Sequence, residues 1–293
     1  MEDVSALSLP GPLVTVDWLA ERLDEPGLLV LDASVGSHRR PVPAIPGAQL
    51  FDLDGSLSAP DSALPHTMPS PEQFERELRE LGLNETGTVV VYDNAGVYSS
   101  ARGWWMLRAM GFDAVAVLDG GLPAWSAAGL PQQEAPAQVA RPGDFTAGPR
   151  PELIVDSAVV LAALSDPGAA VLDARAHDRF TGASPEPRPG LRGGHMPGAF
   201  SLPFTALLDD SGRFRPADEL RALFADRFSP QPERLLFSCG SGVTACVLAL
   251  GATLAGYARG SALAVYDGSW SEWGLPSALP VVSDELSAAP STL

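Results

Sequence analysis

The same order of strands, turns and helices occurs twice along this chain of 293 residues. The segment Val171-Leu172-Asp173-Ala174 repeats Val30-Leu31-Asp32-Ala33, and Gly242-Val243 repeats Gly96-Val97. The offset between the copies is 141 residues at the first pair and 146 at the second, so only small loop insertions separate them. Apolar runs that alternate with helical patterns predict an α/β fold, with mostly parallel central sheets flanked by helices. The chain is therefore predicted to be a tandem duplication of one α/β domain.

The segment that separates the two copies is rich in proline, glycine and glutamine, which is typical of a linker. We expect an N-terminal domain at 1–130, this linker at 131–152 and a C-terminal domain at 153–293. Hydrophobic residues make up 45% of the sequence, so each half can bury a core.

Composition excludes several classes of partner. The chain has 19 Lys and Arg against 36 Asp and Glu, a formal charge of −17, which argues against nucleic acid or an anionic membrane surface. Two cysteines are too few for a disulfide scaffold and are typical of a reducing compartment. Residues 1–5 lack the features of a signal peptide, and no apolar run could span a bilayer, so we expect a cytoplasmic protein. No metal-ligand spacing and no nucleotide-binding glycine motif occurs, so neither a metal nor a cofactor is expected.

The strongest functional signal is the stretch 234–250, in which an apolar run, a short loop with two glycines and an Ala/Val/Leu-rich segment follow one another. This pattern predicts a buried strand, a turn and a buried helix, with Cys239 opening the turn. Such a turn directs backbone N–H groups to one point beside the positive end of the helix dipole. A thiolate there would be stabilised, so Cys239 is a candidate nucleophile. The alternative is a small buried residue at a strand end.

The duplication supplies an internal comparison for this cysteine. Aligning Gly96 with Gly242 places Asp93 at the position of Cys239. A carboxylate cannot perform thiol chemistry, so we expect one reactive copy and one non-catalytic copy.

Three motifs together resemble the two-domain rhodanese family. They are Cys-Gly-Ser-Gly-Val-Thr at 239–244, Gly-His-Met-Pro-Gly-Ala at 194–199 and Asp-Gly-Ser-Trp-Ser-Glu-Trp-Gly at 267–274. The likeness covers residues 10–280, and implies two tandem rhodanese-like domains. The first motif is similar to the loop of family members that use 3-mercaptopyruvate, whereas thiosulfate-using members carry basic residues after the cysteine.

The resemblance implies transfer of sulfur from 3-mercaptopyruvate, through a persulfide on Cys239, to a thiol, thioredoxin or cyanide, with release of pyruvate. The loop that would hold the persulfide through its N–H groups comprises Gly240, Ser241, Gly242, Val243 and Thr244. The alternatives are a thiosulfate sulfurtransferase and a non-catalytic sulfur carrier. A cysteine phosphatase of related fold would need an arginine where Ala245 stands. Self-contained tandem domains favour a monomer.

Arg179 and Arg188 match the family's two carboxylate-binding arginines, and a guanidinium fork suits a carboxylate. From the residues alone, both could equally be solvated loop charges, or Arg179 could pair with Asp178 or Asp173.

The resemblance also implies a relay of Asp54, His66 and Ser241 that would move a proton as the C–S bond breaks. The alternative for His66 is an exposed side chain in a proline-rich loop.

Overall fold

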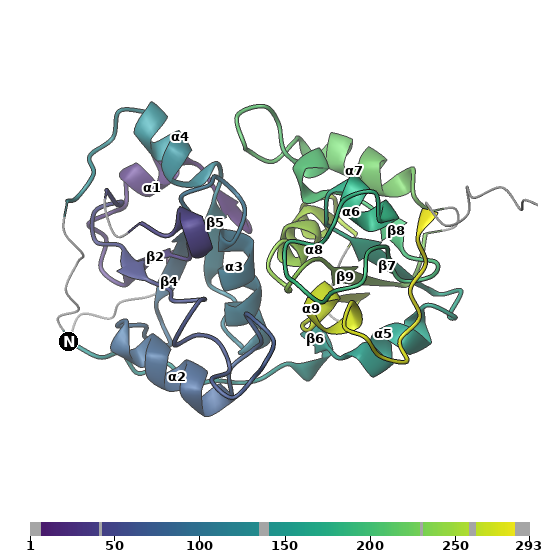
Figure 1. The fold of residues 1–293 in the computed structure, drawn as a ribbon. Helices are drawn as coiled ribbons and strands as arrows, with labels where there is room; N and C mark the ends of the chain where they lie inside the picture. Colours follow the sequence, from purple (N-terminus) through teal and green to yellow (C-terminus); the bar gives the residue numbers. More distant parts are fainter. Residues whose placement is uncertain (1–6, 41–42, 135–140, 229–230, 258–261, 285–293) are drawn as a thin grey trace, which may run out of the picture. The chain divides into compact units, whose positions relative to one another are not determined.

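The computed structural model describes residues 7–40, 43–134, 141–228, 231–257 and 262–284 (Figure 1). Part of the predicted linker, 135–140, and the predicted absence of a signal peptide at 1–5 therefore fall outside the described residues. The chain forms two compact units. The first contains the described residues of Met1–Ser62, Met68–Pro151 and Leu208–Phe214, and the second those of Ala63–Thr67, Glu152–Leu207 and Arg215–Leu293.

The first unit is built on a five-stranded parallel sheet in the order β1-β5-β4-β2-β3. Its strands are β1 (Leu13–Val14), β2 (Leu28–Asp32), β3 (Gln49–Leu50), β4 (Thr88–Tyr92) and β5 (Val115–Leu118). Its helices are α1 (Val16–Ala20), α2 (Pro71–Glu80), α3 (Ser100–Ala109) and α4 (Gly121–Ala127), with a 3-10 turn η1 (Gly36–His38).

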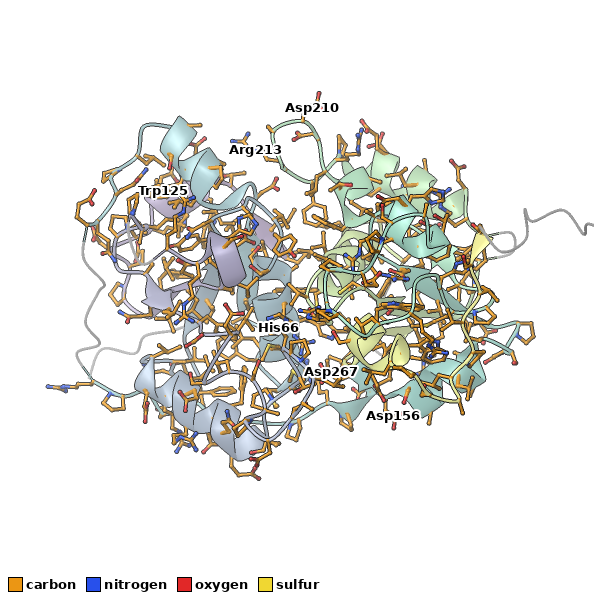
Figure 2. All side chains as sticks on the ribbon, viewed as in Figure 1. His66, Trp125, Asp156, Asp210, Arg213 and Asp267 are labelled. Atoms are coloured by element: carbon orange, nitrogen blue, oxygen red, sulfur yellow. The ribbon has the colours of Figure 1, made fainter. Side chains whose placement is uncertain are left out.

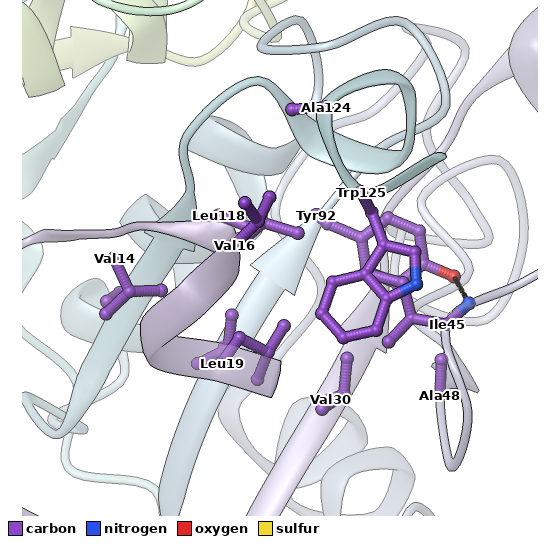
Figure 3. Packing of buried hydrophobic residues seen from close by; sticks show 12 residues of the cluster. Val14, Val16, Leu19, Val30, Ile45, Ala48, Tyr92, Leu118, Ala124 and Trp125 are labelled. Atoms are coloured by element: carbon purple, nitrogen blue, oxygen red, sulfur yellow. Dashed lines mark hydrogen bonds between the residues drawn. The ribbon is translucent and has the colours of Figure 1, made fainter. Parts of the chain in front are cut away.

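Local sequence rules explain how these elements begin and pack. The Ser70 hydroxyl caps α2 by accepting a hydrogen bond from the amide of Gln73 (3.2 Å), and Pro71 occupies the first turn, as predicted. Every residue of β4 is buried, because helices cover both faces of the sheet. On the face shown in Figure 3, residues of α1 and α4 pack against β2, β4 and β5 around Trp125. On the other face, a Cβ on Gly103 would lie 2.9 Å from Val91 Cγ1, so glycine allows α3 to approach β4.

The second unit repeats this plan, with the sheet order β6-β10-β9-β7-β8 and parallel pairing throughout. Its strands are β6 (Ile154–Val155), β7 (Ala169–Asp173), β8 (Phe200–Ser201), β9 (Arg234–Ser238) and β10 (Leu263–Tyr266). Its helices are α5 (Ser157–Ala163), α6 (His177–Thr181), α7 (Ala217–Ala225), α8 (Ala245–Leu254) and α9 (Ser269–Trp273), with 3-10 turns η2 (Pro151–Leu153) and η3 (Phe204–Leu207).

The strand registers confirm the predicted duplication. Asp32 pairs with Tyr92 in the first sheet, and Asp173 pairs with Ser238 in the second. These pairs differ by the 141 and 146 residues of the sequence repeat. The tandem α/β fold is therefore confirmed, whereas the domain limits at 130 and 153 stay predictions. Among the described residues, each helix falls short of the length and apolar character that crossing a membrane requires.

Candidate active site

Cys239 directly follows the central strand β9, as the sequence predicted. The residue is buried, with 1% of its surface exposed, and its thiol forms no disulfide within the described chain. In open parallel sheets, ligands bind outside the carboxyl ends of the strands. Cys239 therefore stands at the edge of the second sheet where chemistry is expected.

The backbone of Cys239 and Gly240 is fixed by the start of α9. The Cys239 amide donates to Ser269 Oγ (3.1 Å), and the Cys239 carbonyl accepts from the Trp270 amide (2.9 Å). The Gly240 carbonyl accepts from both the amide (2.9 Å) and the hydroxyl (2.6 Å) of Ser271. Ser269 adopts a positive φ of 46°, a conformation that non-glycine residues reach only when their surroundings impose it. The 267–274 motif thus positions the loop that begins at Cys239.

The first copy shows what a loop of this shape binds. Asp93 is fully buried, and its Oδ2 accepts hydrogen bonds from three backbone amides at 2.8–2.9 Å, those of Tyr98, Ser99 and Ser100. Its Oδ1 accepts a fourth, from Ala95 (2.9 Å). The loop therefore surrounds an anion with N–H donors. In the second copy the aligned amides are those of Ser241, Thr244, Ala245 and Cys246, of which the last donates to the Val243 carbonyl (3.1 Å).

The rest of the Cys239 loop leads into the buried helix α8. Gly242 has a φ of +75°, which glycine adopts without strain, and Thr244 is the residue before the helix. Val243 and Thr244 are both buried. The Cys246 thiol lies inside α8 and donates to the Gly242 carbonyl (3.3 Å), so this second cysteine supports the loop.

Both predicted arginines lie beside the residue after the cysteine. A Cβ built on Gly240 would lie 3.4 Å from Arg179 Nη2 and 3.8 Å from Arg188 Nη1. The two guanidinium groups therefore flank Gly240. This arrangement offers a carboxylate two cationic partners next to the Cys239 position.

Arg179 is held by a buried glutamate. Its Nη2 donates to Glu186 Oε2 (2.5 Å), and the Glu186 side chain is 2% exposed. The sequence alternative in which the Arg179 guanidinium pairs with Asp178 or Asp173 is wrong, because that guanidinium pairs with Glu186. Asp178 accepts from the Arg179 amide and the Ser184 hydroxyl, and Asp173 pairs with Arg175. These pairings depend on how the loops fold back, which residue spacing does not reveal.

Glu186 is in turn anchored by Arg175, whose side chain is fully buried. Arg175 Nη1 donates to Glu186 (2.8 Å), its Nε and Nη2 fork onto Asp173, and its guanidinium lies 3.9 Å from the Trp270 ring centroid. Burial lowers the pKa of Arg175, but Asp173 and Glu186 outweigh this effect, so the pKa is raised overall. Arg175 therefore stays charged and fixes Glu186, which fixes Arg179.

Arg188 differs from Arg179 in its electrostatic surroundings. Its Nη1 donates to Ser271 Oγ (3.4 Å), and within the described ranges it has no ion-pair partner. The charge of Arg188 is thus the less compensated of the two. We infer that an incoming carboxylate gains most from Arg188, with Arg179 as the oriented second donor.

His66 belongs to the second unit and contacts the cysteine loop (labelled in Figure 2). Its Nδ1 lies 2.9 Å from Ser241 Oγ, although 175 residues separate them in the sequence. The residue has a positive φ of 59°, which histidine adopts more readily than most side chains. His66 is half-buried, so the alternative of an exposed loop histidine is wrong.

Asp54 belongs to the first unit, where its Oδ2 accepts a hydrogen bond from the Gly36 amide (2.7 Å). The residue is exposed. Its part in the relay stays a prediction.

Sequence reasoning missed four residues that support the site, namely Arg175, Glu186, Ser269 and Ser271. Glu186 offered one signal, because it is an acid in the same short loop as the two arginines. The two serines lie inside the 267–274 motif, but nothing in that motif predicts that they bind Cys239 and Gly240. Within the described residues, no group of three or more His, Cys, Asp or Glu side chains could hold a metal ion.

Comparison with known proteins agrees with this arrangement. The rhodanese-like domain family matches residues 15–128 and 157–275. The chain is 40% identical over 277 residues to the 3-mercaptopyruvate sulfurtransferase of Escherichia coli (strain K12), covering 92% of this chain and 96% of that protein. It is 37% identical over 312 residues to the mitochondrial thiosulfate/3-mercaptopyruvate sulfurtransferase 1 of Arabidopsis thaliana, covering 97% and 81%.

A solved structure matches over the same extent. The crystal structure of SseA from Escherichia coli, a 3-mercaptopyruvate sulfotransferase with the rhodanese fold, superimposes with a TM-score of 0.77 at 38% identity. The match covers 89% of this chain and 99% of SseA. With the sheet order, the loop after β9 and these matches in agreement, the chain belongs to the rhodanese family, with two rhodanese-like domains in tandem.

Proposed function

We propose that this chain is a 3-mercaptopyruvate sulfurtransferase that carries sulfur as a persulfide on Cys239. The observation that carries the proposal is the position of Arg179 and Arg188 at 3.4 and 3.8 Å from the Cβ position of Gly240. A substrate carboxylate bound there would hold its own sulfur near the Cys239 thiolate. The name of the Escherichia coli relative supports the same donor.

In the first half-reaction, the Cys239 thiolate attacks the sulfur of 3-mercaptopyruvate. A new S–S bond forms and the substrate C–S bond breaks, leaving its electron pair on carbon as the enolate of pyruvate. The enolate takes up a proton and leaves as pyruvate. The anionic persulfide gains N–H donors of the Gly240–Thr244 loop, as the Asp93 carboxylate gains backbone donors in the first copy.

In the second half-reaction, an acceptor thiolate attacks the outer sulfur of the persulfide. The S–S bond breaks, the acceptor becomes a persulfide, and the Cys239 thiolate is regenerated. A dithiol acceptor, such as that of thioredoxin, would then release hydrogen sulfide as its second thiol closes a disulfide. Cyanide would instead become thiocyanate.

The contact between His66 and Ser241 supports a role in proton transfer. Histidine is a common general acid or base, and the 2.9 Å contact would let Ser241 pass a proton between His66 and the substrate. Asp54 would complete this relay by orienting His66.

The Arabidopsis relative favours thiosulfate as a second donor, because its name includes both substrates. Arg188 could bind a thiosulfate oxygen. However, Gly240 and Ser241 add no positive charge next to the sulfur, so 3-mercaptopyruvate should be the better substrate.

The remaining features of the proposal follow from the two copies. The N-terminal domain, 1–130, would be non-catalytic in that Asp93 replaces the cysteine nucleophile, although it would supply Asp54 and His66 to the relay, and 153–293 would be the catalytic domain. We further propose a cytoplasmic monomer that binds neither nucleic acid nor membranes and needs no cofactor. Its net charge of −17 and the absence of a disulfide among the described residues support this assignment.

A steady-state assay tests the donor directly, with 3-mercaptopyruvate and thiosulfate compared at saturating cyanide or dithiol. We expect the higher kcat/KM with 3-mercaptopyruvate. Cys239→Ser should abolish turnover with both donors, whereas Cys246→Ser should keep most of it. Equal losses in both variants would contradict a single nucleophile, and failure with every small donor would favour a sulfur carrier.

The clamp is tested by Arg188→Ala, with Arg227→Ala as the matched control because Arg227 is an exposed arginine of the same unit. Arg188→Ala should raise KM for 3-mercaptopyruvate by about tenfold to a hundredfold and affect thiosulfate less. An unchanged KM would remove Arg188 from the clamp.

A further inference from the structure

The first unit contains a cavity of about 310 Å³ at the carboxyl edge of its sheet. Asp32 and Tyr92, which end β2 and β4, line it together with Gln49, Arg39 and Arg40. This volume lies at the lower end of the range of small-molecule sites, about 300–1,000 Å³. The carboxyl ends of parallel strands are also the usual place for ligands in such sheets. The cavity therefore has the size and position of a ligand site, although this copy carries Asp93 in place of the cysteine.

A buried carboxylate forms the inner wall of the cavity. Asp32 is 6% exposed, and its Oδ1 accepts hydrogen bonds from the amide (2.9 Å) and the hydroxyl (2.5 Å) of Ser34. Burial raises the pKa of Asp32, Ser34 and Arg39 lower it, and Asp93 raises it, with a net increase. The nearby Arg39 is engaged by Asp52 at 2.9 Å. Neutral donors thus hold a buried anion that would gain from a cation.

The second copy fills the corresponding place with a guanidinium. The offset of 141 residues aligns Asp32 with Asp173 and Ser34 with Arg175. Arg175 forks onto the Asp173 carboxylate at 2.7–3.0 Å. Where the second copy has an arginine side chain, the first has a serine beside a cavity.

A second contact shows that the Arg175 guanidinium occupies the position in the second unit that corresponds to the cavity in the first. Arg175 Nη2 also donates to the carbonyl of Gly194 (2.8 Å), the residue before His195. In the sequence repeat His195 aligns with Ala44, which lines the cavity of the first unit. In the second copy, the Arg175 guanidinium therefore lies between Asp173 and the turn at Gly194. In the first copy, the cavity lies between Asp32 and the corresponding turn at Ala44.

We propose that the cavity binds a small guanidinium compound that also carries a carboxylate, such as an arginine-like amino acid. Its guanidinium pairs with Asp32 as Arg175 pairs with Asp173 in the second unit. Its carboxylate reaches Arg40 at the mouth, since Arg39 is already engaged by Asp52. The Tyr92 hydroxyl accepts a hydrogen bond from the Ile45 amide (3.4 Å; Figure 3). Tyr92 also lines the cavity.

Isothermal titration calorimetry on the full chain tests the proposal with three probes. L-arginine carries both groups, agmatine lacks the carboxylate, and L-citrulline lacks the cation. We expect saturable binding of L-arginine at one site, binding of agmatine weaker by about tenfold, and none for L-citrulline. Absence of saturable L-arginine binding, or equal binding of L-citrulline, would overturn the proposal.

Variants show whether any binding occurs in this cavity. Asp32→Asn should weaken L-arginine binding by about tenfold or more, and Arg40→Ala should weaken L-arginine but not agmatine. Asp61→Asn is the matched control, because Asp61 is an exposed aspartate of the same unit, and binding should not change. Equal affinities in Asp32→Asn and Asp61→Asn would mean that the acidic surface binds the cation, and would overturn the proposal.

Ser34→Arg offers the most direct test, because it supplies in the first unit the side chain that Arg175 supplies in the second. It should abolish L-arginine binding and leave sulfurtransferase activity unchanged. Ser34 also accepts a hydrogen bond from the Asn94 amide (2.9 Å), so circular dichroism must confirm that the variant folds. A folded variant that still binds L-arginine as wild type would refute the site, and the Asp32 and Arg40 variants test it if folding fails.

Discussion

The buried carboxylate of Asp93 provides a quantitative test of the anion-binding loop. It accepts four backbone hydrogen bonds, three at Oδ2 and one at Oδ1. The variant Asp93→Asn keeps one oxygen and replaces the other by an amide donor. The best orientation keeps the oxygen toward the three amides and turns the NH₂ group against the Ala95 N–H.

The cost follows from these contacts. One hydrogen bond to a charged acceptor is lost, which is about 1.5–3 kcal/mol, and three others become neutral, each about 1 kcal/mol weaker. The expected destabilisation is therefore about 4–6 kcal/mol. For a unit of this size, each 1 kcal/mol lowers Tm by about 2–4 °C, so the transition of the first unit should shift by about 10 °C or more.

Differential scanning calorimetry measures the shift, and hydrogen exchange of residues 95–100 measures the loop directly. Asp113→Asn is the matched control in the same unit, because the Asp113 side chain is 59% exposed in its ion pair with Arg150. That change should cost no more than about 1 kcal/mol. If Asp93→Asn costs no more than Asp113→Asn and leaves amide protection intact, the loop does not depend on a bound anion. The comparison with Asp93 would then no longer support the proposal that the loop after Cys239 binds an anionic persulfide.

Three further predictions concern the active site and the cavity. Glu186→Gln should raise KM for 3-mercaptopyruvate about tenfold with a smaller change in kcat, because Arg179 loses its orienting carboxylate; steady-state kinetics showing a fall in kcat alone would contradict this. His66→Asn should lower kcat about a hundredfold. Adding Ser241→Ala should lower kcat little further, because the two side chains act through one contact. Additive losses in kcat would instead show that the two residues act independently. Binding of L-arginine should weaken as pH falls toward the raised pKa of Asp32, because the protonated acid cannot pair with guanidinium. Calorimetry should place this loss at a higher pH than an ordinary aspartate would, and a loss only at the ordinary aspartate pKa would show that another carboxylate binds the ligand.

Much of the fold could be predicted because its signals are local. Buried runs such as 88–92 lack alternation, which indicates a strand covered on both faces, and the Ser70-Pro71 start of α2 has its own capping chemistry. Because the sequence repeats, each strand or helix predicted in one copy was supported by its counterpart in the other. The loop of Cys239 was also predictable, since a strand, a glycine turn and a helix must follow one another there.

The contacts of the site were harder to predict, because they join distant segments. The family resemblance implied that His66 and Ser241 are partners. The sequence itself did not predict this contact, because 175 residues separate the two positions. The positions of Ser269 and Ser271 against the Cys239 loop depend on how α9 meets the end of β9.

The sequence by itself therefore determined the duplicated α/β fold and the presence of Asp93 in the first copy at the position of Cys239, the candidate nucleophile. Only the tertiary structure decided which charges neutralise one another: Glu186 pairs with Arg179, while Arg188 has no ion-pair partner among the described residues. It alone also showed that an aspartate common to both copies faces an arginine in one and a cavity in the other. The physical reason is that strands and turns follow from short-range patterns of hydrophobicity, whereas the pairing of buried charges depends on distances that arise only when loops pack together.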